Sequence, residues 1–262
     1  MIWSLGAALI SGGLVGFALG LVGGGGSILA TPLLLYVVGV PQPHAAIGTS
    51  ALAVSVNAFA NLTGHARAGN VHWRCAIVFA LIGTLGAFAG SSVGKIIDGE
   101  RLLFLFGLVM LAVGATMLRP RQNKAETESQ VDLRTCFITG AIAFAAGLAS
   151  GFFGVGGGFL VVPALIFATG MPIIKAIGSS LLAIGSFGLA TAINYAFSGL
   201  VDWPVAGEFI VGGMIGGMFG MMLAKQLSTQ KNVLNRVFSG LIFVVAAYIL
   251  YRSGQAFMTT PR

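Results

Sequence analysis

Charged residues are scarce in this chain: they account for 8% of its 262 residues, while hydrophobic residues account for 56%. Soluble domains carry about 25% charged residues on average, so this composition excludes a soluble fold, whose surface must face water. The apolar runs are long and continuous, whereas a membrane β-barrel has segments of about ten residues with alternating polarity. The sequence therefore predicts an all-α integral membrane protein that lies in the lipid bilayer.

Cysteine and histidine are too few, and too scattered, to build a metal centre. The two cysteines, Cys75 and Cys136, and the histidines, His44, His65 and His72, show no metal-ligand spacing. The phosphate-binding pattern GxxxxGK[ST] is also missing, so we expect no cofactor, no metal and no ATP hydrolysis by this chain. The net charge of +7 comes without a basic patch interleaved with aromatic residues. This argues for basic cytoplasmic loops and against nucleic-acid binding.

What the chain does contain is a set of apolar runs that occurs twice. A polar linker, RPRQNKAETESQVDLR at 119–134, separates the two sets. A shift of about 130 residues aligns Pro32 with Pro163 and AIGTS (46–50) with AIGSS (176–180). We interpret this as an internal duplication, with repeat 1 over 1–118 and repeat 2 over 135–262. The runs lie at about 3–22, 27–40, 45–63, 74–94 and 102–118, and then at about 135–153, 158–170, 176–197, 204–224 and 235–251.

The first two runs decide the topology. The N-terminal run lacks the basic region of a signal peptide, so we interpret it as part of the fold. Runs 3–22 and 27–40 exceed one span of about 20 residues, so they form two spans or a hairpin that dips into the membrane. Either option returns the chain to its starting side and makes the repeats inverted. Ten Lys and Arg residues then share the linker side and four the other, as the positive-inside tendency favours. We predict about 8–10 membrane segments and a cytoplasmic linker.

Each repeat contains a glycine cluster inside a membrane-like run: GLVGGGGSILATP at 20–32 and GFFGVGGGFLVVP at 151–163. Inverted repeats with broken helices are typical of secondary transporters. A helix start presents unpaired N–H groups and a positive dipole end, and glycine allows the tight backbone that aims them at one anion. The clusters predict a small-anion site that works by alternating access. Its candidate residues are Gly23, Gly24, Gly25, Gly26, Ser27, Gly154, Gly156, Gly157 and Gly158, with Thr49, Ser50, Ser179 and Ser180 as hydroxyl donors.

Other features of the runs have two interpretations each. Scattered glycines such as Gly86 and Gly216 are interpreted as helix packing sites rather than functional breaks. Asn57 and Asn61 share one helix face and either line the substrate path or bond across helices. Glu208 is the only acid clearly inside a run, and it either couples transport to protons or is paired near the outer end.

The pattern as a whole resembles a known family. The duplicated glycine–proline pattern, the AIG[TS]S stretch and the G-x3-W spacing together resemble the TauE/SafE family of sulfite exporters and toluene-sulfonate uptake permeases, over residues 5–252. The resemblance implies a multi-pass permease of the bacterial inner membrane for sulfite, organosulfonates or other small organic anions, and not an enzyme. Family members are assigned to both uptake and export. Ser27 stands where the second cluster has a glycine.

Two other functions are alternatives to the transporter. An anion channel has the same backbone site, and the sequence does not separate it from a transporter. An intramembrane enzyme is less favoured, because it requires a nucleophile with a base, or a set of metal ligands, and the chain has no HExxH or GxSxG pattern.

Overall fold

The computed structural model describes residues 2–118, 133–154, 158–227, 240, 243–244 and 246–251. Within these residues the chain forms helices and no strand, which confirms the all-α prediction. Two short helices, α2 (Ser27–Leu33) and α7 (Gly158–Thr169), alternate with long ones, and the single-turn segments η1 (Gly24–Gly26) and η2 (Leu34–Val38) flank α2. The long helices are α1 (Ile2–Val22), α3 (Pro43–Arg67), α4 (Trp73–Gly94), α5 (Gly99–Leu118), α6 (Leu133–Phe153), α8 (Ile173–Ala196) and α9 (Trp203–Leu227).

The described helices suit a lipid environment. Four of them, α3, α4, α8 and α9, are long and apolar enough to cross a membrane. Large apolar side chains point away from the protein on several helices: Leu85 on α4 is 69% exposed and Phe219 on α9 is 62% exposed. An apolar surface of this extent indicates contact with lipid rather than with water.

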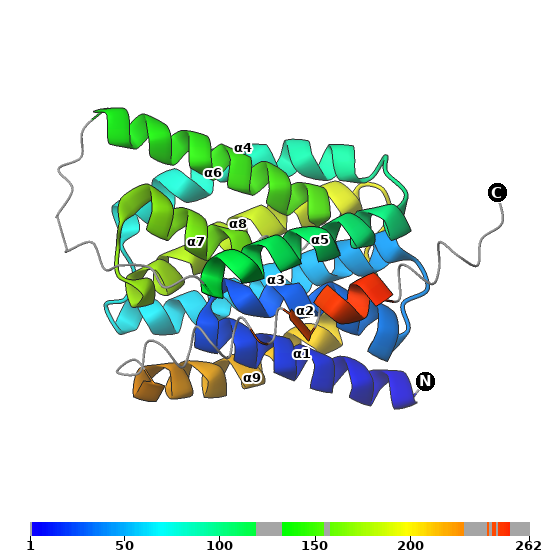
Figure 1. The fold of residues 1–262 in the computed structure, drawn as a ribbon. Helices are drawn as coiled ribbons and strands as arrows, with labels where there is room; N and C mark the ends of the chain where they lie inside the picture. The colour runs from blue at the N-terminus through cyan, green and yellow to red at the C-terminus, as the bar shows by residue number, and fades with distance from the viewer. Residues whose placement is uncertain are drawn as a thin grey trace.

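The order of elements is the same in the two halves of the chain (Figure 1). A long helix, a glycine turn, a short helix with an internal proline and two long helices make up α1 to α4, and the same series makes up α6 to α9. The chain runs along α1 to the glycine turn and comes back along α2 toward the end at which α1 begins (Figure 1). The first two runs therefore return the chain to its starting side, as the predicted inversion of the repeats requires.

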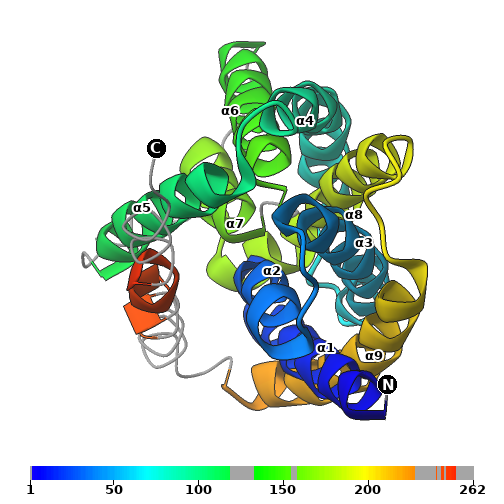
Figure 2. The same ribbon diagram turned by 90° about the vertical axis from the view of Figure 1, so that its right-hand side faces the viewer.

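The two halves interlock. α1 packs along α9, α6 along α4 and α3 along α8, so each of these contacts joins one half to the other (Figure 2). Glycines allow the closest approaches, because a Cβ at Gly16 or Gly216 would meet the backbone of the facing helix, as would a Cβ at Gly86 or Gly90 on α4. These glycines therefore serve helix packing, as predicted for Gly86 and Gly216.

Helices α3 and α8 lie antiparallel at the centre of the bundle. The Ser55 hydroxyl on α3 donates a 2.6 Å hydrogen bond to the Gly185 carbonyl oxygen on α8. The bundle has two ends, which we name after the histidines found there. The His44 end contains His44, Ile97 and Leu200, and the His72 end contains Asn70, His72 and Gly178.

Candidate functional site

The first glycine turn interrupts the helix that α1 and α2 would otherwise form. The Gly23 N–H closes α1 with a 2.8 Å hydrogen bond to the Leu19 carbonyl oxygen. Gly23 then adopts φ 71° and ψ −118°, a conformation that residues with a Cβ rarely adopt. The Ser27 hydroxyl donates to the Gly24 carbonyl oxygen at 2.8 Å and stabilises the start of α2. The helix breaks here because glycine alone fits position 23 without strain.

The second glycine turn, between α6 and α7, also begins with a glycine that has a positive φ angle. Gly154 has φ 65°, and its N–H donates to the Gly151 carbonyl oxygen at 3.0 Å. α7 begins at Gly158, which takes the place of Ser27, so this turn lacks the hydroxyl that the first turn has there. Gly156 and Gly157, both predicted for the anion site, lie outside the described residues.

The two turns meet inside the protein. A Cβ placed on Gly24 would overlap the backbone of Gly158, and a Cβ placed on Gly158 would overlap the backbone of Gly24. Both glycines are buried. The segments that begin two short helices, one from each half, therefore touch backbone to backbone.

Each turn also packs against the central helix of the other half. A Cβ on Gly23 would lie 3.0 Å from the Ile177 Cγ2 and 3.2 Å from the Ser180 hydroxyl oxygen on α8. Gly154 contacts the Ile47 side chain on α3 in the same manner. Ile47 and Ile177 are matching residues of the repeated AIGTS and AIGSS stretches. The repeated motif thus provides, in each half, the isoleucine that packs against the glycine turn of the other half.

Comparison with known proteins identifies this architecture. The family model described as sulfite exporter TauE/SafE matches residues 8–249. The chain belongs to the TauE/SafE family. A probable membrane transporter protein of Xylella fastidiosa is 63% identical over 253 residues, which is 96% of this chain and 97% of that protein.

More distant relatives of this TauE/SafE protein have the same description. Probable membrane transporter proteins of Methanocaldococcus jannaschii and Haemophilus influenzae are 29% and 30% identical, over 70% and 78% of each chain. No solved structure matches the chain. The family and the apolar helices together establish a multi-pass membrane transporter, and they confirm the resemblance found in the sequence.

Of the predicted hydroxyls, that of Ser180 lies beside the first glycine turn and that of Ser50 contacts α2. Ser180 faces Gly23, as described above, and Ser50 occupies the matching position on α3. The Ser50 hydroxyl donates to the Ile47 carbonyl oxygen at 2.9 Å, and its oxygen lies 2.8 Å from the Thr31 Oγ1. Because Ser50 uses its hydrogen on Ile47, Thr31 is the donor in that second bond. Sequence reasoning missed Thr31, although a hydroxyl directly before the proline of the first cluster could have drawn attention to it.

The other two predicted hydroxyls hold loops instead. The Thr49 hydroxyl oxygen accepts a hydrogen bond from the backbone N–H of Asp202, and the Ser179 oxygen accepts one from the backbone N–H of His72, each at 2.9 Å. Asp202 and His72 directly precede α9 and α4. Thr49 on α3 therefore anchors the loop that leads into α9, and Ser179 on α8 anchors the loop that leads into α4. The structure uses their oxygen atoms for these loops rather than for the glycine turns.

Asn57 and Asn61 lie in the contact between α3 and α9. The Asn61 side-chain amide donates to the Asn57 backbone carbonyl oxygen at 2.9 Å and packs against Gly217. Asn57 is fully buried against Gly213, and neither of its side-chain amide atoms has a hydrogen-bond partner among the described residues. Leaving a buried amide unpaired costs about 1–3 kcal/mol. We therefore expect the Asn57 amide to form hydrogen bonds in another state of the protein, in which α3 and α9 lie further apart.

A further hydroxyl beside the second turn escaped the sequence analysis. Ser150 is fully buried one turn before Gly154, and its hydroxyl has no hydrogen-bond partner in the described part of the chain. Other buried serines of the described helices, such as Ser50 and Ser180, donate to a carbonyl of their own helix. Ser150 therefore adds a free donor to the turn that lacks a counterpart of Ser27. The signal in the sequence was its position next to the first glycine of the second cluster.

Glu208 lies away from the glycine turns. It is half-buried in the second turn of α9, next to Phe209, whose backbone contacts Gly12 on α1. Gly217, which faces Gly20 near the end of α1, is about 14 Å further along α9 at 1.5 Å per residue. In the part of the chain that the structure describes, no three His, Cys, Asp or Glu side chains come together as a metal site.

Proposed function

We propose that this chain is a secondary transporter that moves small anions across the bacterial inner membrane by alternating access, with sulfite, organosulfonates or related organic anions as substrates. Membership of the TauE/SafE family and the description of its relatives as probable membrane transporters support the transporter class. The observation that carries the proposed site is the contact between Gly24 and Gly158, where two helix beginnings from opposite halves converge.

The chemistry of this meeting point suits an oxyanion. The hydroxyls of Ser27, Ser50, Thr31 and Ser180 lie in the turns or on the helices α2, α3 and α8 that pack around them, and the first residues of a helix have backbone N–H groups without a partner in that helix. Helix beginnings bind anions through such groups, and neutral donors also allow the anion to leave again. Each half supplies one turn, so a movement of one turn relative to the other changes the side from which the anion has access.

The orientation in the membrane follows from charge. Arg67, Arg74 and Lys175 lie near the His72 end, at the termini of α3, α4 and α8, whereas Lys95 and Arg101 lie near the His44 end. Because cytoplasmic loops are rich in Lys and Arg, we place the His72 end and the linker 119–134 in the cytoplasm. The His44 end then faces outward.

An anion channel built on the same site is the competing function. The backbone contact between Gly24 and Gly158 leaves no room for an ion to pass directly between the two turns, which favours a transporter with alternating access. Counterflow separates the two: a transporter loaded with unlabelled anion accelerates uptake of labelled anion from the other side, and a channel does not.

The first experiment measures thermal stabilisation of the purified protein by sulfite, sulfate, thiosulfate, an organosulfonate, a carboxylate and chloride at matched ionic strength. A ligand present at 100 times its Kd stabilises the folded state by about 2.7 kcal/mol, so we expect a sulfur oxyanion or organosulfonate to raise the Tm selectively. Counterflow in proteoliposomes with that anion follows. An unchanged Tm with every anion, together with no counterflow, would contradict the proposal.

A pair of serine variants on α8 tests the location of the site. Ser180→Ala removes a hydroxyl that faces Gly23, and we expect up to about tenfold weaker anion binding, the equivalent of roughly 1 kcal/mol for one hydrogen bond. Ser186→Ala is the matched control, because Ser186 donates to the Leu182 carbonyl oxygen of its own helix at 2.9 Å, as Ser180 does to that of Ile177 at 2.8 Å, but it is half-buried and is not among the groups at Gly23. Equal Kd values for both variants would place the anion elsewhere.

A further inference from the structure

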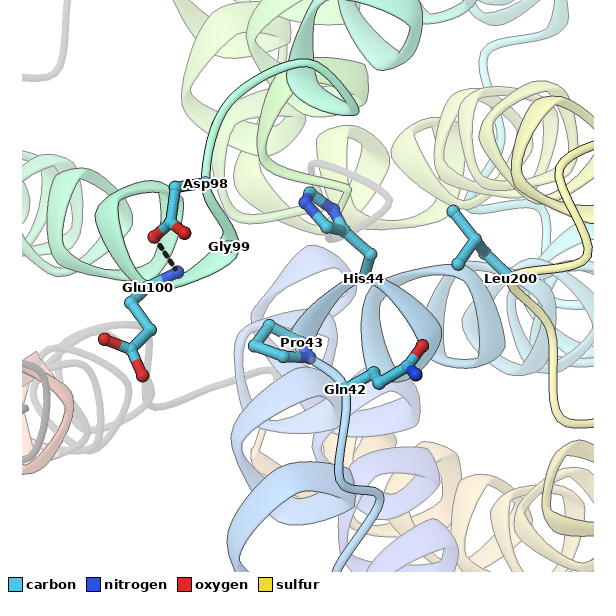
Figure 3. Close-up of a pocket in the computed structure, with 7 residues that line it drawn as sticks. All are labelled: Gln42, Pro43, His44, Asp98, Gly99, Glu100 and Leu200. Carbon is cyan, nitrogen blue, oxygen red and sulfur yellow. Dashed lines mark hydrogen bonds between the residues drawn. The ribbon is translucent and has the colours of Figure 1, made fainter.

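A cavity of about 370 Å³ opens at the His44 end of the bundle (Figure 3). Three parts of the chain meet there: the start of α3, the segment between α4 and α5, and the segment between α8 and α9. The cavity is separate from the contact between the two glycine turns, and the anion site proposed above does not use it. The residues around it are Gln42, Pro43, His44, Asp98, Gly99, Glu100 and Leu200.

His44 has an unused proton-accepting atom at this cavity. Its Nε2 lies 3.0 Å from the Ile97 carbonyl oxygen, and because a carbonyl oxygen only accepts, Nε2 carries the hydrogen of this bond. In a neutral imidazole the other nitrogen, Nδ1, then has a free lone pair. Nδ1 is buried and has no hydrogen-bond partner among the described residues. A proton can therefore add at Nδ1 while the bond to Ile97 remains in place.

Two acidic residues line the cavity at the start of α5, and a third, Asp202, follows the lining residue Leu200 two positions along the chain. Asp98 and Glu100 line it together with His44 (Figure 3), and Asp98 accepts the backbone N–H of Glu100 at 3.1 Å, which caps α5. In the segment between α8 and α9, Asp202 accepts the backbone N–H of Val205 at 3.2 Å. A cavity bordered by carboxylates attracts a positive ligand of small size, and a proton is the smallest.

A cation, the ammonium of Lys95 after α4, lies on the Tyr195 ring of α8, which packs beside His44. The Tyr195 ring packs beside His44, with 6.2 Å between the ring centroids, and the Lys95 ammonium lies 5.9 Å from the centre of the Tyr195 ring. Lys95 donates to the Asn194 Oδ1 at 2.8 Å and to the Ser198 hydroxyl at 2.9 Å. These neutral acceptors hold the Lys95 ammonium in place beside the Tyr195 ring, so the position of this charge does not depend on the charge of His44.

The cavity connects with the second glycine turn through one face of α3. His44 and Ile47 are three residues apart and therefore lie on the same side of the helix. The Ile47 side chain contacts Gly154, so His44 lies one turn outward from the residue that supports the second glycine turn. A change of charge at His44 acts on the start of α3, where that helix also contacts the other half through Tyr195.

We propose that His44 is the proton-binding group that couples anion transport by this protein to a proton gradient; this inference rests on the anion transport proposed above. Nδ1 takes a proton from a hydronium ion at the His44 end and leaves water. The imidazolium places a positive charge at the start of α3, one helical turn from Ile47, which contacts the second glycine turn. This charge favours an anion bound at the turns, so proton and anion move in the same direction. This assigns to His44 the coupling role for which the sequence suggested Glu208.

The test uses the full-length protein in proteoliposomes that contain a pH-sensitive dye. An inward anion gradient drives uptake of the anion identified by stabilisation, and acidification of the interior reports accompanying protons. We expect acidification with the unsubstituted protein and its loss with His44→Gln, because glutamine can still donate to Ile97 but binds no proton. The dependence of the uptake rate on pH is lost as well. His72→Gln is the matched control, since the hydrogen bonds of His72 to other described residues come from its backbone, and it keeps the acidification.

Each other outcome is also decisive. Acidification that persists in both His44→Gln and His44→Asn overturns the inference, as does anion uptake by the unsubstituted protein without any acidification. Counterflow moves no net proton, so it remains measurable in His44→Gln if the variant is folded, and His44→Asn replaces it if it is not. Absence of counterflow in the unsubstituted protein contradicts the proposed function itself, and a failure of proton coupling alone does not.

Discussion

Two interfaces at matching places in the halves have opposite chemistry. On α3, Asn57 lies against Gly213 of α9, and on α8, Phe187 lies against Gly83 of α4. These positions correspond under the shift of 130 residues. The Phe187 ring also stacks on Phe79, with 6.2 Å between the centroids, whereas the side-chain amide of Asn57 has no hydrogen-bond partner among the described residues. The duplicated backbone is the same, but one interface is closed by aromatic packing and the other is lined by an unsatisfied amide.

The same contrast recurs nearer the ends of these helices. The Asn194 side-chain amide on α8 donates to the Ser91 hydroxyl at 2.7 Å and to the Ser92 hydroxyl at 2.9 Å, and its oxygen accepts from Lys95 on α4. At the matching place of the other pair, Gly64 on α3 lies against the sulfur of Met221 on α9. We infer that α4 and α8 form a fixed pair, which keeps the same relative position during transport. In contrast, α3 and α9 can move relative to each other.

The largest expected effect comes from breaking the aromatic interface. Phe187→Ala leaves a cavity between α8 and α4 and costs about 3–5 kcal/mol of stability, whereas Asn57→Ala, at the matching place, costs less than about 1 kcal/mol because its amide is unpaired. Unfolding in detergent, followed by intrinsic fluorescence, measures both. Asn57→Leu sharpens the contrast: we expect stability to be kept or raised and transport to fall. Equal losses for Phe187→Ala and Asn57→Ala would refute the asymmetry.

An intermediate effect is expected at the polar end of the fixed pair. Asn194→Ala removes the acceptor of Lys95 and the donor to Ser91 and Ser92, and we expect a loss of about 1–3 kcal/mol. Hydrogen exchange should increase along α4 and α8 and stay unchanged along α3 and α9. Faster exchange along all four helices would show that the network does not act on one pair alone.

The smallest effects test a feature that the two halves share. Thr49→Val and Ser179→Ala each remove the acceptor of one loop N–H, so each should lower stability by about 0.5–1.5 kcal/mol. Anion affinity should be unchanged, since both oxygen atoms hold loops. Measuring Tm and Kd for both variants decides this, and Gly207→Ala, at an exposed helical position with open space around it, is a neutral control. A weaker Kd in either hydroxyl variant would return that residue to the anion site.

Much of this architecture could be predicted because glycine and proline constrain the backbone locally. The breaks at Gly23 and Gly154 and the duplication could be predicted from residue types alone. The roles of the adjacent hydroxyls in AIGTS and AIGSS could not, since neighbouring helical residues point about 100° apart. Helix rotation, set by the packing of α3 on α8, decides that Ser50 contacts Thr31 on α2 and Thr49 contacts the loop before α9.

Single polar residues were the hardest to interpret from sequence. His44 and Ser150 have no motif around them, and both became informative only when the structure showed a buried nitrogen or hydroxyl without a partner. Asn57 was recognised as polar within a span, yet its interpretation depended on which helix it faces. These are properties of contacts between residues far apart in the chain, and a pattern of near neighbours does not contain them.

The pairing of α1 with α9 has a consequence for biosynthesis. Gly12 and Phe209, which touch in the folded protein, are about 200 residues apart in the chain, so the ribosome needs roughly 10–40 s to make the second after the first, at about 5–20 residues per second. During that time the glycine face of α1 has lipid, or the insertion machinery, in place of its partner. Helix α1 is therefore made long before the helix that fixes it, and a chain that stops before α9 leaves α1 without its partner helix.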